Sequence, residues 1–266
     1  MRRLTLAALA LIVLGCARSS TGAPPSPSPA STELTIYGAA SLSAVLDAAK
    51  TAYEAAVPGT RLTISTDSSA ALETQIEQGA PADVFLAADT MNPTKLVDGG
   101  FAAGDAVVFA GNELTVIVPN GNPAAIGSPA DLGRDGVKLI AAGDEVPITK
   151  YATQLVENLA KQPGYPAGFR AAYAANVVSK EDNVKAVVAK VGLGEGDAAI
   201  VYVTDAKASS DVDTVEVPDA ANVPASYSGV VVRSSKNVDA AKAFLTWIAG
   251  PAGQAILGDA GFLPPP

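Results

Sequence analysis

The chain changes from an apolar run to a helical pattern at Tyr37-Gly38-Ala39-Ala40-Ser41-Leu42. The run before this stretch, Leu34-Thr35-Ile36, has the composition of a β-strand, and the apolar residues after it recur at the spacing of an amphipathic helix. Ser41 is therefore expected at a helix N-terminus, where its hydroxyl and the unpaired backbone N–H groups can face a ligand. Free donors and the helix dipole both favour an anion at such a place.

The same strand-to-helix change recurs at Thr66-Asp67-Ser68-Ser69-Ala70-Ala71-Leu72. Taken alone, the serines of both stretches have a simpler explanation as helix caps, because serine is a favoured N-cap residue. Asp67 beside Ser68 is also a candidate acceptor for an anion that keeps a proton, as phosphate does.

Three further places offer hydrogen-bond donors of the same kind. Val146-Pro147-Ile148-Thr149 and Asp182-Asn183-Val184-Lys185 each begin a predicted helix, and Tyr202 lies near the end of a predicted strand. A tyrosine in that position is ordinarily a core residue, although its hydroxyl needs a partner if it is buried. All these donors are neutral, and such a set suits a fully deprotonated oxyanion.

The composition excludes several classes of function. The 266 residues carry 18 Lys and Arg against 27 Asp and Glu, a net charge of −9, and no basic cluster, so a nucleic-acid partner is not expected. The chain has no histidine and a single cysteine, Cys16, which excludes a Ser-His-Asp triad, a Cys-His pair and a histidine-ligated metal. The composition does not exclude an enzyme that uses a Ser-Lys dyad or a pair of carboxylates.

The first 32 residues are expected to precede the fold. Residues 1–15 have a positively charged start and a short apolar run, the pattern of a signal peptide, and Gly15-Cys16 resembles the end of a bacterial lipobox. We therefore expect Cys16 to be lipidated; the alternative is an ordinary secretory signal with an incidental cysteine. Residues 16–32 are rich in Pro and Ser and are expected to form an extended tether.

From Glu33 onward, strand-like and helix-like segments alternate, as in an α/β fold. The predicted strands are Leu34–Tyr37, Leu62–Ser65, Asp83–Ala87, Glu113–Val118, Val137–Ala141, Ala198–Val203, Thr214–Val217 and Gly229–Arg233. The predicted helices are Ser41–Ala56, Ser69–Gln78, Thr94–Asp98, Pro129–Leu132, Pro147–Leu159, Pro166–Ala174, Asn183–Val191, Val238–Ala249 and Pro251–Leu257. The length and the lack of an internal linker indicate two lobes, with Leu114–Val118 and Gly229–Arg233 as candidate crossing strands and the ligand between the lobes.

The order and spacing of these motifs resemble the periplasmic molybdate-binding proteins of ABC importers, the ModA-type solute-binding proteins. The resemblance extends from about Glu33 to Phe262. Its most specific parts are the two serine stretches, Gln75-Ile76-Glu77-Gln78-Gly79-Ala80-Pro81-Ala82-Asp83-Val84-Phe85, Gly143-Asp144 with Val146-Pro147, Glu181-Asp182-Asn183-Val184, Ile200-Val201-Tyr202-Val203-Thr204-Asp205-Ala206 and Gly261-Phe262.

The resemblance implies a two-lobed type II periplasmic-binding-protein fold, each lobe a mixed sheet flanked by helices. The expected lobes are residues 33–114 plus 233–266 and residues 115–232. Carried over by position, the oxyanion-binding residues are Ser41, Ser69, Ile148, Val184 and Tyr202. The resemblance also implies a monomeric, extracytoplasmic protein without a cofactor or a directly ligated metal. It would be lipid-anchored to the cell membrane or periplasmic, and it would deliver molybdate, or tungstate, to an ABC permease.

Two departures from the family pattern affect the choice of ligand. Ile148-Thr149 replaces the usual small residues after Val-Pro, and Asp67 would bring negative charge near the anion if it pointed inward. These departures leave a binding protein for sulfate, phosphate or another small oxyanion as the nearest alternative. Alternatives from other classes are a serine-dependent enzyme with a lysine base and a surface scaffold lipoprotein.

Overall fold

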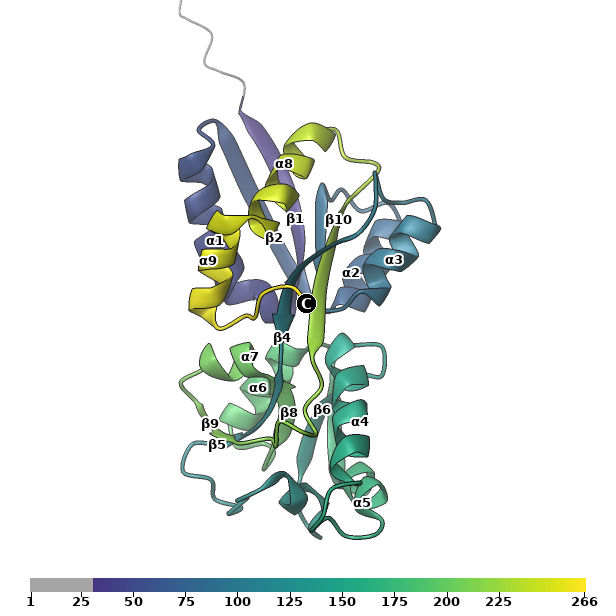
Figure 1. Ribbon diagram of the computed structural model, residues 1–266, viewed down its shortest axis with the longest axis vertical. Helices are drawn as coiled ribbons and strands as arrows, with labels where there is room; N and C mark the ends of the chain where they lie inside the picture. The colour runs from purple at the N-terminus through teal and green to yellow at the C-terminus, as the bar shows by residue number, and fades with distance from the viewer. Residues whose placement is uncertain (1–30) are drawn as a thin grey trace, which may run out of the picture. The chain divides into compact units, whose positions relative to one another are not determined.

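The structure is a computed structural model that describes residues 31–266 (Figure 1). The expected signal peptide, Cys16 and nearly all of the expected tether lie outside the described residues. Within residues 31–266, no helix combines the length and the apolar character needed to cross a membrane.

The first sheet has five strands in the order β2-β1-β3-β10-β4. They are β1 (Thr32–Ala39), β2 (Thr60–Asp67), β3 (Val84–Ala87), β4 (Val107–Asn112) and β10 (Ala225–Val231). β1 pairs in parallel with β2 and β3, whereas β10 is antiparallel to β3 and β4. β1 and β2 end in register at the pair Ala39 and Asp67, so the segments that follow them begin at the same sheet edge.

Helices cover both faces of this sheet (Figure 1). The short 3-10 helix η1 (Ala40–Leu42), α1 (Ser43–Ala56), α8 (Val238–Ala249) and α9 (Pro251–Ala260) lie on one side, and α2 (Ser69–Glu77) and α3 (Met91–Asp98) lie on the other. β3 serves both faces because successive strand residues point in opposite directions. Its Val84 and Leu86 belong to the core cluster that includes α1 and α8, and Phe85 and Ala87 belong to the cluster with α2 and α3.

The second lobe contains a three-stranded antiparallel sheet and a parallel strand pair. The sheet has the order β8-β5-β9, with β5 (Leu114–Pro119), β8 (Ala199–Tyr202) and β9 (Val212–Val215); the pair is β6 (Leu139–Ala142) with β7 (Val177–Glu181). The helices of this lobe are η2 (Pro129–Gly133), α4 (Pro147–Leu159), α5 (Phe169–Asn176), α6 (Val184–Gly192) and α7 (Val203–Lys207). A bridge between Leu139 and Ala198 joins the strand pair to the sheet.

The chain passes from the first sheet to the second across one residue, since β4 ends at Asn112 and β5 begins at Leu114. Asn222 lies in the segment between β9 and β10, which leads back to the first sheet. This residue joins that segment to the crossing, since its Oδ1 accepts from the Leu114 N–H at 3.1 Å and its Nδ2 donates to the Leu114 carbonyl at 2.9 Å. These paired sheets confirm the predicted α/β class.

The strand pairing of β10 differs from the prediction. We expected a crossing strand at Gly229–Arg233, but β10 begins at Ala225 and pairs along its length with β3 and β4 of the first sheet. From this pairing we propose that the chain returns to the first lobe near residue 225 rather than at residue 233.

Candidate functional site

A narrow cleft lies between the two sheets, with a cavity volume of about 10 Å³. From the first lobe it is lined by Ala39, Ala40, Ser41, Ser68, Ser69 and Ala88, and from the second by Val146, Pro147, Ile148, Val184 and Tyr202. The five residues that the sequence predicted are all among them. The volume is room for about one water-sized body, so little free space remains between the lining residues in this structure.

Four helix beginnings line this cleft. Ser41 lies in η1 directly before α1, Ser69 is the first residue of α2, Ile148 is the second residue of α4, and Val184 is the first residue of α6. Backbone N–H groups in the first turn of a helix have no acceptor within the helix. The cleft therefore brings together first helical turns, with their positive ends, from both lobes.

Ser41 and Ser69 are not helix caps, although the cap explanation holds for Ser68. The predicted helix at Ser41 begins as the 3-10 turn of η1, where Ala39 is the N-cap residue and no side chain caps. At α2 the cap is Ser68, whose Oγ accepts from the Ala71 N–H at 3.2 Å. The hydroxyls of Ser41 and Ser69 are left for other partners.

Each of these two hydroxyls accepts one hydrogen bond from the protein. The Tyr227 hydroxyl donates to Ser41 Oγ at 2.9 Å, and the Ala88 N–H donates to Ser69 Oγ at 3.0 Å. Both serines are buried, with Ser69 only 1% exposed.

Tyr202 brings a phenol from the end of β8 into the same place. Its hydroxyl donates to the Ala88 carbonyl at 3.4 Å, and its ring packs edge-on against Tyr151 and Tyr227. Burial, followed by the neighbouring Tyr227 and Tyr151, raises the pKa of Tyr202 well above its usual value. The phenol is therefore a neutral donor throughout the physiological range.

Asp67 does not line the cleft. Its Oδ1 accepts from the Ser68 N–H at 2.7 Å and from Asn183 Nδ2 at 3.3 Å. Asn183 at the same time caps α6, because its Oδ1 accepts from the Ala186 N–H at 3.1 Å. The carboxylate thus joins the end of β2 to the start of α6 at the side of the cleft.

The cleft has no charged lining. None of the described residues that line it is Asp, Glu, Lys or Arg, and within residues 31–266 no group of three or more acidic or cysteine side chains is placed to hold a metal ion. Hydrogen bonds and helix ends are therefore the means by which this site can attract an anion.

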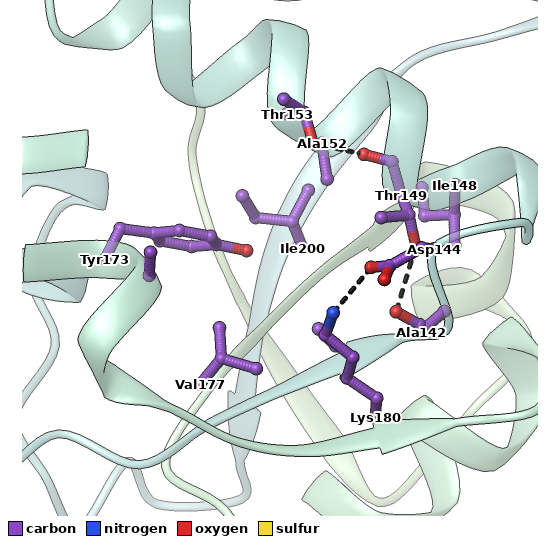
Figure 2. Close-up of a pocket in the computed structure, with 12 residues that line it drawn as sticks. Ala142, Asp144, Ile148, Thr149, Ala152, Thr153, Tyr173, Val177, Lys180 and Ile200 are labelled. Carbon is purple, nitrogen blue, oxygen red and sulfur yellow. Dashed lines mark hydrogen bonds and ion pairs between the residues drawn. The ribbon is translucent and has the colours of Figure 1, made fainter. Parts of the chain in front are cut away.

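A second cavity of about 240 Å³ lies in the second lobe, next to the start of α4 (Figure 2). Ile148 lines both spaces. The walls are mostly apolar; Lys180 is paired with Asp144 at 2.5 Å, and Thr149 donates to the carbonyls of Ala142 and Gly143. Burial raises the pKa of Tyr173, which points into this space, to about 12. The cavity lacks the converging helix ends of the cleft.

Asp205 is a buried carboxyl group near Tyr202 and Tyr227. Its Oδ2 has no hydrogen-bond partner among the described residues, and it borders a cavity that Ser41 also lines. Burial raises the pKa of Asp205 to about 7, against the opposing effect of a backbone hydrogen bond from Tyr202.

Sequence reasoning missed Tyr227, which donates a hydrogen bond to Ser41, and Asn112, which donates to the Tyr227 hydroxyl. Tyr227 is 186 positions away from Ser41 along the chain and lies on a strand that was predicted to begin only at Gly229. No local pattern marks either residue, because only the sheet order brings them to the cleft.

Comparison with known proteins agrees with this architecture. A model of the family described as bacterial extracellular solute-binding protein matches residues 34–263. The chain belongs to this family. It is a family of solute-binding proteins and not of enzymes.

Individual solute-binding proteins are similar over most of their length. The molybdate-binding protein ModA of Mycobacterium tuberculosis is 32% identical, over 93% of this chain and 90% of the relative, which confirms the resemblance stated from the sequence. Among solved structures, the periplasmic molybdate-binding protein of Azotobacter vinelandii has a TM-score of 0.74 at 23% identity and covers 88% of this chain and 100% of its own. The sulfate-binding protein SubI of M. tuberculosis has a TM-score of 0.78 at 24% identity, over 88% and 87%. These two structures confirm the two-lobed periplasmic-binding-protein fold.

Proposed function

We propose that this protein captures molybdate, and also tungstate, outside the cytoplasm and delivers it to an ABC permease. The observation that carries the proposal is the cleft itself, where four helix beginnings and one phenol converge without any charged side chain. A relative 32% identical over 93% of the chain that is named a molybdate-binding protein supports this choice of oxyanion.

The binding residues in this proposal are Ser41, Ser69, Ile148, Val184 and Tyr202. Ser41 and Ser69 give hydroxyls from the first lobe, Ile148 and Val184 give backbone N–H groups from the second, and Tyr202 gives its phenol. The open lobes admit the anion, closure completes the donor set, and the permease recognises the closed form. The protein acts as a monomer, by binding and without catalysis.

A smaller tetrahedral anion cannot reach all these donors at once, so sulfate should bind more weakly than molybdate. Ile148 does not remove a donor, because the donor at this position is the backbone N–H. The negative charge of Asp67 is partly compensated by its two hydrogen bonds and does not enter the cleft.

Thermal unfolding of residues 31–266 with molybdate, tungstate, sulfate or phosphate tests the ligand. An anion present at about 100 times its Kd should stabilise the protein by roughly 2.7 kcal/mol. We expect shifts with molybdate and tungstate. A shift with sulfate or phosphate alone would contradict the choice of ligand, and no shift with any anion would contradict the binding-protein function.

We further propose that Cys16 carries a lipid that anchors the protein to the cell membrane. The support is the short apolar run that ends at Gly15-Cys16, followed by a segment rich in Pro and Ser. Fractionation of cells that express the full chain and its Cys16→Ser variant tests this. The unchanged chain should sediment with membranes, with a lipid mass on Cys16, and the variant should not; equal behaviour of the two would contradict the anchor.

A further inference from the structure

The cavity shown in Figure 2 lies between the helices α4 and α5 and the strands β6, β7 and β8 of the second lobe. Four of its lining residues are alanines, and their small side chains leave the space open: Ala141, Ala142, Ala152 and Ala174. Protein interiors are close-packed, and voids much larger than a water molecule are few. The volume of about 240 Å³ exceeds the roughly 150 Å³ in which an engineered protein cavity binds benzene, so a small organic molecule fits.

The cavity has a buried floor and an exposed mouth. The residues of the floor are all buried: Ala142, Ile148, Ala152 and Ile200. The residues of the mouth are all exposed: Asp144, Thr153, Ala174 and Lys180. A molecule from the solvent can therefore enter at the mouth and reach the apolar floor.

The Tyr173 hydroxyl points into this cavity from α5 (Figure 2). None of the described residues that line the cavity forms a hydrogen bond with it. A hydroxyl among apolar walls needs a partner, because loss of its hydration without a new hydrogen bond is costly. Burial keeps the pKa of this phenol at about 12, so it is a neutral donor at physiological pH. The cavity thus offers an unused hydrogen-bond donor beside its apolar walls.

The other polar side chains of the cavity already have partners. The hydroxyls of Thr149 and Thr153 donate to backbone carbonyls. Lys180 is paired with Asp144 at the mouth, so the two charges compensate each other and favour neither an anion nor a cation. These walls therefore suit a neutral molecule with an apolar body and one hydrogen-bond acceptor for Tyr173.

Ile148 connects this cavity to the cleft, because it lines both spaces. Its backbone N–H is a proposed donor to the anion, and its side chain forms part of the cavity floor. The first turn of α4 is already fixed on one side by Thr149, whose hydroxyl donates to the carbonyls of Ala142 at 3.1 Å and Gly143 at 2.8 Å. A molecule in the cavity would pack against the Ile148 side chain and hold the same turn from the other side.

We propose that this cavity is a second binding site, which takes a neutral small molecule with an apolar body and one hydrogen-bond acceptor, and that its occupant strengthens anion binding in the cleft through Ile148. The site itself does not depend on the proposed function, whereas its effect on the cleft rests on that function. The effect is reciprocal, so molybdate would strengthen binding in the cavity by the same factor.

Acetophenone, an aromatic ring with one carbonyl group, is a suitable probe of the site. We expect an NMR titration of residues 31–266 to show saturable shifts of the amide signals of Ile148, Ala152 and Tyr173. Tyr173→Phe removes the donor and should weaken acetophenone binding about fivefold, the scale of one buried hydrogen bond. Ethylbenzene has no acceptor, so it should bind to the unchanged protein and to Tyr173→Phe alike.

A cavity-filling variant separates this site from general surface binding. Ala152→Leu places a larger side chain in the floor of the cavity and should abolish the binding of both probes. Ala171→Leu, at an exposed position of α5 that does not line the cavity, should bind them as the unchanged protein does. The site would be overturned by acetophenone that causes no saturable shift up to its solubility limit, by binding that survives Ala152→Leu, or by equal weakening of both probes in Tyr173→Phe.

Calorimetry with molybdate tests the effect on the cleft. Saturating acetophenone should lower the molybdate Kd about fivefold, the lower end of typical coupling between sites, and should have no effect in Ala152→Leu. A molybdate Kd that ignores bound acetophenone would overturn the coupling alone. A protein that binds acetophenone but no molybdate would overturn the proposed function and the coupling, but not the site.

Discussion

The side-chain amide of Asn183 donates to Asp67 Oδ1 over 3.3 Å and thereby joins the two lobes at the side of the cleft. Asp67 ends β2 of the first sheet, and Asn183 caps α6 of the second lobe. The first N–H of α6 belongs to Val184, a proposed ligand donor. Because the two residues belong to different lobes, separation of the lobes would break this contact, which also helps to place that donor.

Replacement of Asn183 should speed the release of molybdate. Asn183→Ala loses the cross-lobe bond, worth about 0.5–1.5 kcal/mol, and so should raise koff several-fold. It also loses the helix cap and about 1 kcal/mol of unfolding free energy. Asn183→Ser is the matched control, because a serine keeps the cap but is too short to reach Asp67. We expect stopped-flow measurements to show faster molybdate release in both variants, and a lowered Tm only in Asn183→Ala. Unchanged release in both variants would contradict the role of the contact.

The proposed donors should each contribute to affinity. Ser41→Ala and Tyr202→Phe remove one hydroxyl each from a buried site, so each should weaken molybdate binding by at least ~1 kcal/mol, or roughly fivefold in Kd. Ser43→Ala is a suitable control, because Ser43 lies two residues further on, as the first residue of α1, and does not line the cleft. Calorimetry that finds wild-type affinity in both Ser41→Ala and Tyr202→Phe would contradict the assignment of these residues.

The buried Asp205 should make stability depend on pH. Its pKa rises from the usual 3.8 to about 7 in the folded protein, so between these values the folded state holds a proton that the unfolded state has lost. Stability from this group is therefore fully present below about 3.8, falls as the pH rises toward 7, and is level above it. Asp205→Asn imitates the protonated acid and should flatten this dependence.

Thermal unfolding of wild type and Asp205→Asn across this pH range measures the effect. The variant should gain in Tm relative to wild type as the pH rises to 8 (about one unit above the folded pKa) and should lose that advantage near pH 5. Asp47→Asn, at an exposed position of α1, should run parallel to wild type. A constant difference between Asp205→Asn and wild type at every pH would show that the carboxyl does not titrate as described.

Close packing of β10 on β3 should make Gly229 sensitive to substitution. A Cβ at this position would lie 2.6 Å from Leu86 Cδ2 and 2.9 Å from the Phe85 carbonyl oxygen, so Gly229→Ala should cost about 1–3 kcal/mol. At Gly258 in α9 such a Cβ would meet no atom within 4 Å outside the local helix backbone and the adjacent residues, and Gly258→Ala should stabilise the helix by roughly 0.5–1 kcal/mol. Urea unfolding measures both; equal stability of the two variants would contradict this account of the packing.

Much of the local structure could be predicted from the sequence, because proline, serine and apolar spacing act over short distances. Pro147 at the first position of α4 and the valine spacing of α6 predicted both helices to within one residue. β4 and β7 were missed. β7 is a short strand in which half-buried and exposed residues alternate, but its sequence, Val177-Val178-Ser179-Lys180-Glu181, does not alternate between apolar and polar residues. β4 contains Gly111 and Asn112, which are uncommon in strands.

The candidate site was predictable only as far as its helix beginnings. The sequence indicated that Ser41, Ser69, Ile148 and Val184 lie at such places, and the structure brings them together with Tyr202 around one cleft. It could not indicate that Ser68 rather than Ser69 caps α2, because either serine can adopt the cap geometry. Nor could it indicate that Tyr227 contacts Ser41, since this contact depends on the long-range order of the sheet.

The placement of β10 determines when the cleft can exist during synthesis. The strands of the second lobe all come from one stretch, Leu114 to Val215, whereas the first sheet needs β10 between β3 and β4. A chain that emerges from its N-terminus therefore presents β1, β2 and β3 early but leaves their sheet incomplete until residues 225–231 arrive. Pairing over such a sequence separation is slow. The lobe that begins the fold is thus the last to be finished, and a chain that ends before residue 225 lacks the Tyr227 hydroxyl that donates to Ser41.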